Sequence, residues 1–151
     1  MAGGQPVEDA LGDDGRGGLG NVDPSQHVGV DGASDGEASW LRALRDPAVA
    51  GALALLHDRP AQAWTIEALA NEVHVSRATL ARRFTELVGE PPLAYLTRWR
   101  MDLAARRLRE TAEPVGAVAE SVGYRSEYAF PRAFSRVRGE PPGRYRREQA
   151  A

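Results

Sequence analysis

Two arginines, Arg82 and Arg132, stand fifty positions apart at matching places in two copies of one sequence repeat. A guanidinium carries its N–H donors in a fixed fork, and two of them match the O6 and N7 acceptors of guanine. Such a contact discriminates between bases by about 1–3 kcal/mol. A phosphate contact or a salt bridge is an equally open role for either side chain. Both residues are therefore candidates for recognition, and the repeat that carries them decides what they could reach.

The repeat covers residues 76–95 and 126–145, and eight of its twenty aligned positions are identical. Each copy begins with a serine that can cap a helix and continues with apolar residues at helical spacing. Gly89 and Gly139 follow where a helix favours a left-handed last residue, and a pair of prolines then permits a new helix to begin. One helical unit is therefore predicted to occur twice.

A short amphipathic segment precedes each copy, at residues 66–73 and 115–122, and ends in a turn before Ser76 or Ser126. Two short helices joined by a tight turn form a helix-turn-helix, whose second helix can lie in the major groove of DNA. The turn before Ser126 is one residue longer than the turn before Ser76. The pattern predicts two helix-turn-helix motifs in tandem, with a reading helix after each serine.

The rest of the pattern predicts an all-α fold of about seven helices, with two helix-turn-helix subdomains joined by a long linker helix. Residues 40–44 form a helical turn or two, Asp46 caps the next helix, and residues 142–147 form a short last helix. The linker helix runs from Pro92 to about residue 110 and is about 27 Å long. Such a stiff element could hold two reading helices about 34 Å apart, one turn of B-DNA. Because the repeat is direct, the expected DNA site is asymmetric.

Charge divides the chain into two parts. Residues 1–39 contain eight acids and one base, a net charge of −7, whereas residues 40–151 contain eighteen bases and thirteen acids, a net charge of +5. Residues 1–38 are rich in glycine and poor in large apolar side chains, so a disordered acidic tail is predicted there. Residues 39–151 form the predicted DNA-binding domain, whose positive charge suits a polyanion.

Several other functions find no support in the sequence. The chain has no cysteine, which excludes thiolate metal sites and cysteine nucleophiles, and its three histidines are far apart. No catalytic triad, zinc-protease motif or carboxylate pair is visible, so we expect no enzyme, no cofactor and no metal. No signal peptide and no apolar run of bilayer length are present, so we expect no membrane contact and a cytoplasmic location.

Position gives the candidate DNA contacts, because base edges are read from the N-terminal half of a reading helix. The base-reading candidates are Arg77, Ala78, Thr79, Ala81, Arg82, Tyr128, Ala129 and Arg132. The phosphate candidates are Ser76, Arg83, Arg125, Ser126, Arg136 and Arg144. Glu127 shares the reading position but would repel phosphate. Arg100, inside the linker helix, is expected to pair with a carboxylate or with carbonyl groups of the domain itself.

Pro131 interrupts the second reading helix. It falls five residues after Ser126, where it would remove a helical N–H and crowd the carbonyl group of Glu127. A bend near the start of the helix would redirect it. The second motif could then contribute shape or backbone contacts more than base reading.

A longer pattern joins these features. It comprises Leu69-Ala70, Ser76, Leu80, Phe84, Gly89, Pro92, Tyr95-Leu96, Arg100-Met101, Ala104, Leu108, Ala119, Val122-Gly123-Tyr124, Ser126, Phe130, Arg132, Phe134, Gly139, Pro142 and Tyr145-Arg146. With this pattern, residues 46–147 resemble the DNA-binding domain of the AraC/XylS family of bacterial transcription regulators. The resemblance implies sequence-specific binding of double-stranded DNA. RNA polymerase is a further candidate partner.

Runs within residues 64–101 resemble the branch of that family whose members carry an N-terminal cupin-type sensor domain. No segment of cupin size precedes residue 39, so the sensor domain is expected to be missing, and no small-molecule effector site is expected. One alternative is a truncated relative that acts as an interaction partner or decoy for RNA polymerase or a full-length regulator. Another is that residues 1–39 reflect a displaced start codon or a gene fragment.

Overall fold

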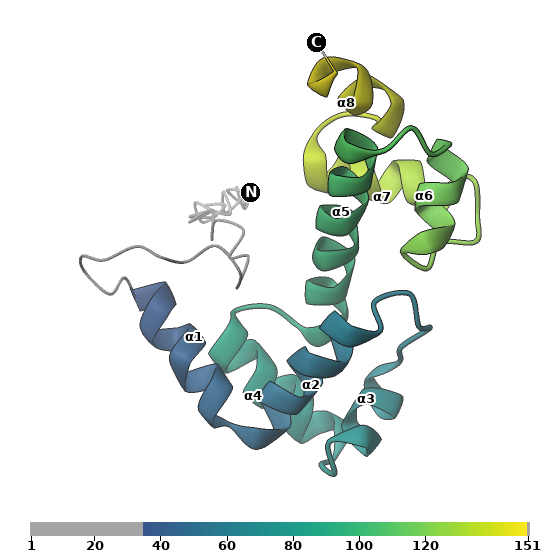
Figure 1. The fold of residues 1–151 in the computed structure, drawn as a ribbon. Helices are drawn as coiled ribbons and strands as arrows, with labels where there is room; N and C mark the ends of the chain where they lie inside the picture. Colours follow the sequence, from purple (N-terminus) through teal and green to yellow (C-terminus); the bar gives the residue numbers. More distant parts are fainter. Residues whose placement is uncertain (1–34, 151) are drawn as a thin grey trace, which may run out of the picture.

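The computed structural model describes residues 35–150, and every regular element in that range is a helix (Figure 1). The eight helices are α1 (Asp35–Arg45), α2 (Pro47–Asp58), α3 (Ile66–Glu72), α4 (Arg77–Val88), α5 (Pro92–Glu110), α6 (Val115–Ser121), α7 (Ala129–Arg138) and α8 (Pro142–Gln149). The predicted all-α fold is confirmed, with one more helix than expected because α1 is a complete helix that begins inside the segment 1–38. Residues 1–34 and Ala151 lie outside the described residues, and with them most of the predicted acidic tail.

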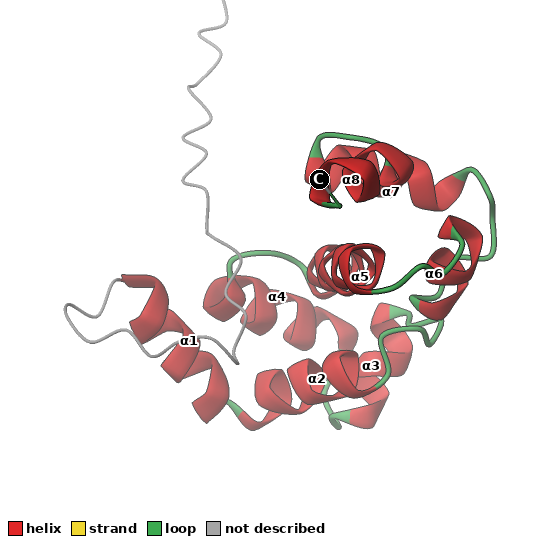
Figure 2. Ribbon diagram, turned by 45° about the horizontal axis from the view of Figure 1, so that its top comes forward, coloured by secondary structure: helices red, strands yellow, loops and turns green. Residues whose placement is uncertain are grey.

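The helix α5 connects two packed units, which lie at its two ends in Figure 1; in Figure 2 α1 to α4 lie below it, α7 and α8 above it and α6 beside it. The first unit holds α1 to α4 and the second holds α6 to α8. Each unit has its own core: Phe84 and Leu96 are buried in the first, and Met101 and Phe134 in the second. Trp99 of α5 still packs against the first core. The linker helix therefore passes from one core to the other within two residues.

Local sequence signals begin and end most of the helices where they were predicted, and α7 is the exception described below. Asp46 and Thr65 accept hydrogen bonds from first-turn N–H groups of α2 and α3, and Ser76 does the same for α4. Gly89 and Gly139 end α4 and α7 in the left-handed conformation, with φ of 95° and 83°. A proline then begins each of α5 and α8. The repeat in the sequence is therefore a repeat in structure.

The two helix-turn-helix turns follow the same backbone path. The N–H of Val75 donates to a carbonyl group of α3 at 3.2 Å, and the N–H of Tyr124 donates to the matching carbonyl group of α6 at 3.0 Å. The residue before each donor has a left-handed φ, 59° at His74 and 95° at Gly123. The extra residue of the second motif, Arg125, follows this shared turn. The longer connection therefore leaves the turn itself unchanged.

Candidate nucleic-acid interface

The helix α4 carries the first set of predicted base-reading residues. Arg77, Ala78 and Arg82 are exposed, whereas Thr79 and Ala81 are half-buried. Exposure is needed for a side chain to enter a groove, so the three exposed residues are the better placed. Two small or short side chains, Ala78 and Thr79, near the start of the helix would let its backbone approach the DNA closely.

Both exposed arginines of α4 pair with carboxylates of their own unit. Arg77 Nη1 lies 2.8 Å from Glu67 Oε1 on α3, and Arg82 Nη1 lies 3.8 Å from Glu86 Oε1 one turn further on. The pKa of Glu67 is lowered by a backbone hydrogen bond first and by Arg77 second. Exposed ion pairs stabilise a protein by about 0–1 kcal/mol, so DNA can replace them. The longer pair leaves Arg82 the more available of the two.

The second reading helix begins later than predicted, at Ala129 and not directly after Ser126. Ser126 Oγ accepts hydrogen bonds at 3.3 Å from the N–H groups of both Tyr128 and Ala129, so it caps a turn before the helix. The helix therefore accommodates Pro131 by starting at Ala129, and no bend is needed to explain the proline. Pro131 now falls in the first helical turn, where an N–H has no intrahelical partner. The carbonyl group it would have crowded belongs to Glu127, which lies outside the helix.

This later start changes how the second set of base-reading candidates is presented. Tyr128 precedes α7 and is 78% exposed, which makes it the most exposed large hydrophobic side chain of the described residues. Ala129 and Arg132 are exposed on the first turn of α7. Within residues 35–150, Arg132 takes part in no ion pair. Arg132 is therefore more accessible to a DNA partner than Arg82, which shares its place in the repeat.

The phosphate candidates differ in whether their side chains already interact with other groups of the protein. Arg125 and Arg136 are exposed and pair with no described carboxylate. Ser76 and Ser126 are exposed, but each hydroxyl is engaged in capping. The two arginines are therefore the better candidates for a phosphate contact.

The other two phosphate candidates have partners in their own unit. Arg83 Nη1 lies 3.9 Å from Asp46 Oδ2, the carboxylate that caps α2. Arg144 Nε, on α8, lies 3.0 Å from Glu148 of the same helix and 3.7 Å from Glu140, which precedes it. The hydrogen bond with Glu148 is the largest cause of the raised pKa of Arg144. These ion pairs engage part of each guanidinium, so Arg83 and Arg144 are less available to a phosphate than Arg125 and Arg136.

Other arginines tie helices of the second unit to α5 and were not identified from the sequence. Arg138 Nη2 lies 2.6 Å from Asp102 Oδ1 and ties α7 to α5, while Arg146 Nε donates to the carbonyl group of Leu108 at 3.1 Å and ties α8 to α5. The partners are 36 and 38 positions apart, so no local pattern marks them. The prediction for Arg100 is confirmed, since its guanidinium bonds to backbone carbonyl groups of the domain.

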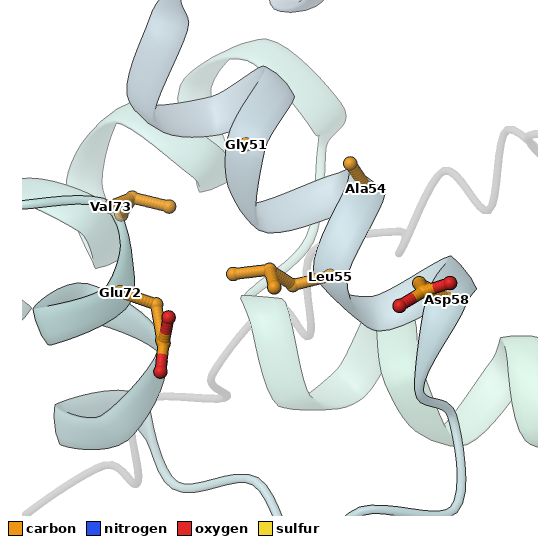
Figure 3. A pocket seen from close by; sticks show the side chains of 6 residues that line it. All are labelled: Gly51, Ala54, Leu55, Asp58, Glu72 and Val73. Atoms are coloured by element: carbon orange, nitrogen blue, oxygen red, sulfur yellow. The ribbon is translucent and has the colours of Figure 1, made fainter.

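A shallow pocket lies between α2 and α3, away from the predicted reading residues (Figure 3). It is lined by Gly51, Ala54, Leu55, Asp58, Glu72 and Val73. Its two charged side chains are both acidic, which does not suit DNA. Among residues 35–150 there is no cluster of metal-binding side chains, and no helix there is long and apolar enough to cross a bilayer. The reading helices thus remain the main candidate site.

Known proteins with similar sequences are transcription regulators, and the similarity falls on the helix-turn-helix region. Residues 69–148 match the family model of a helix-turn-helix domain. A protein of Streptomyces antibioticus, described as an AraC-like transcription regulator, is 54% identical over 115 residues, which is 76% of this chain and 38% of that protein. The transcriptional regulator AlkR of Acinetobacter baylyi is 40% identical over 114 residues, 76% of this chain and 37% of AlkR. The chain therefore spans less than two fifths of these relatives.

Solved structures share the arrangement of the helices. The DNA-binding domain of AdpA, described as the global transcriptional factor and crystallised in complex with a target DNA, matches with a TM-score of 0.65 and 34% identity. That match covers 68% of this chain and 92% of the AdpA domain. A transcriptional regulator from Chromobacterium violaceum, at 23% identity and a TM-score of 0.66, shares the fold over 72% of this chain and 96% of its own.

Proposed function

The chain belongs to the AraC-type helix-turn-helix family of transcription regulators, and we propose that it binds one asymmetric site on double-stranded DNA with α4 and α7 in adjacent major grooves. The observation that carries this proposal is the duplication itself. Two helix-turn-helix motifs with matching turns are packed on the two halves of α5. A single chain then carries the two readers that a dimer otherwise supplies.

The proposal assigns different tasks to the exposed side chains. Arg82 and Arg132 contact base edges, aided by Arg77 and by Tyr128 at the entry to α7. Arg125 and Arg136 make the main phosphate contacts. The remaining serine and arginine candidates make weaker contacts to phosphates. The solved complex of the AdpA domain with a target DNA supports this use of the fold.

Replacing Arg82 by alanine is expected to weaken binding to the specific duplex by roughly 5- to 150-fold, the effect of losing about 1–3 kcal/mol of base readout. Binding to random duplex should change little. Fluorescence anisotropy with both duplexes measures the two affinities. Arg106→Ala is the matched control, because Arg106 is an exposed arginine of α5 that pairs with Glu110 at 3.4 Å. An equal loss on both duplexes would instead make Arg82 a phosphate contact.

We expect the protein to act in the cytoplasm and to contact RNA polymerase from a face that DNA leaves open. The alternative of a partner or decoy that does not bind DNA predicts no preference for any duplex over random competitor. A gel-shift competition distinguishes the two, since a regulator retains its specific duplex in excess random DNA.

A further inference from the structure

The joint between the two units contains more than the linker helix. The helix α5 changes core between Trp99 and Met101, and Arg100 is the residue in between. A helix alone resists bending but leaves the angle between the units attached to it open to small twists. Contacts that bridge the units directly would fix that angle.

Arg100 makes such a bridge. Its Nε donates to the carbonyl group of Pro60 at 2.7 Å and its Nη2 to the carbonyl group of Gln62 at 2.8 Å, both in the loop between α2 and α3 of the first unit. The same guanidinium lies 5.7 Å from the ring centroid of Tyr124, which belongs to the second unit. Tyr124 in turn packs edge-on against Phe130 of the second core, at 5.7 Å between ring centroids. One side chain therefore connects a loop of the first unit to the core of the second.

The loop that Arg100 grips is itself held in place. Trp64 is buried in the first core, and its indole Nε1 donates to the carbonyl group of Arg59 at 2.9 Å. Burial is the main cause of the lowered pKa of Arg100, which places its charge in a partly desolvated site. Hydrogen bonds to a charged group are strongest where water is excluded.

Gly123 supplies an independent contact across the same joint, where the loop between α2 and α3 approaches the turn after α6 (Figures 1 and 2). A Cβ at this position would lie 2.9 Å from the carbonyl oxygen of Ala61 and 3.1 Å from Arg100 Nη2. The matching turn of the first unit has exposed His74 in the same left-handed conformation. A side chain is therefore tolerated at the turn position of the first unit, where φ is 59°. At Gly123 both the φ of 95° and the close approach of the other unit favour glycine.

We propose that Arg100, Gly123 and the loop between α2 and α3 form a fixed joint that sets the angle between α4 and α7, and with it the spacing of DNA blocks that the protein accepts. The inference rests on the proposed two-block DNA site. Arg100 acts here as a positioning residue, because it lies away from the reading helices and works through them. One added base pair turns a block by about 34° around the DNA axis. If the joint fixes the angle between the reading helices, the protein therefore binds tightly only where the two blocks have the matching spacing.

The test compares duplexes that carry both blocks at the preferred spacing, with two base pairs added, or with one block alone. Arg100→Met removes the donors, and Gly123→Asn adds a side chain that still accepts a left-handed backbone. The matched controls are Arg106→Met on α5 and His74→Asn at the equivalent turn position. For the wild-type protein and the controls, we expect a strong preference for the original spacing.

For Arg100→Met, which loses both hydrogen bonds to the loop, the ratio of affinities between original and altered spacing should fall by at least about tenfold. For Gly123→Asn, whose side chain pushes the turn away from Ala61, the ratio should fall in the same direction. Binding to the single-block duplex should be unchanged. An unchanged ratio in a variant with wild-type helix content, whether or not overall affinity falls, would overturn the proposal. If one of the two variants does not fold, the other still tests the proposal by itself. A wild-type protein with no preference for two blocks would instead contradict the proposed function.

Discussion

Replacing Phe134 by alanine is expected to lower the free energy of unfolding by about 3–5 kcal/mol, the cost of a large cavity in a small core. Phe134 is 0% exposed, and its ring lies 5.7 Å from that of Phe130 and 5.4 Å from that of Tyr145. Its ring therefore lies between Phe130 of α7 and Tyr145 of α8. Its removal therefore disrupts the packing of α7 and α8 together.

Urea denaturation followed by circular dichroism measures this loss. Phe134→Leu should lose less than half as much, because most of the volume is kept. Val137→Ala, at a partly exposed position of the same helix, should stay within about 1 kcal/mol of the wild type. The two cores are separate along α5, so Phe134→Ala disturbs mainly the second unit. As the temperature or urea concentration rises, this variant should lose sequence preference in the second DNA block before it loses preference in the first. A loss below about 1 kcal/mol for Phe134→Ala would contradict this view of the second core.

Salt is expected to have the second large effect. If the four arginine phosphate candidates all contact DNA, the affinity should fall by about 100-fold between 50 and 200 mM salt, because each neutralised phosphate releases counterions. If only Arg125 and Arg136 do so, the fall should be about tenfold. The ion pairs of Arg83 and Arg144 with nearby carboxylates favour the smaller value.

The slope of log affinity against log salt separates these cases. Arg125→Ala should reduce the slope by about one contact and weaken specific and random duplexes alike. Arg106→Ala again provides the control. A salt-independent affinity would instead favour the decoy alternative, in which a mostly apolar protein contact replaces the contact with DNA.

Features set by neighbouring residues were predictable from the sequence, and those set by distant contacts were not. The serine cap at Ser76 and the glycine ends at Gly89 and Gly139 depend on bonds within a few residues, so the repeat revealed them. The start of α7 was misplaced because Ser126 has the sequence of a cap. Pro131 excludes a helix that includes Glu127, and the chain avoids the conflict by starting later.

The joint between the units depends on contacts between residues far apart in the chain, which the sequence did not predict. Gly123 could be interpreted as a turn glycine, but its contact with Ala61 joins residues 62 positions apart along the chain. The role of Arg100 was predicted in kind, because an arginine facing inward needs acceptors, yet the identity of those carbonyl groups depends on the packed loop. The exact exposure of the candidate DNA contacts likewise depends on ion pairs formed only in the folded chain.

Selection from a random pool of double-stranded DNA tests the central claim most directly, using the wild-type protein, Arg82→Ala and Arg132→Ala. The two-reader account predicts one asymmetric motif with two blocks about one helical turn apart. Each variant should lose sequence preference in a different block and keep the other. A motif with a single block, a palindrome, or no enrichment at all would contradict the claim that α4 and α7 read adjacent grooves from one chain.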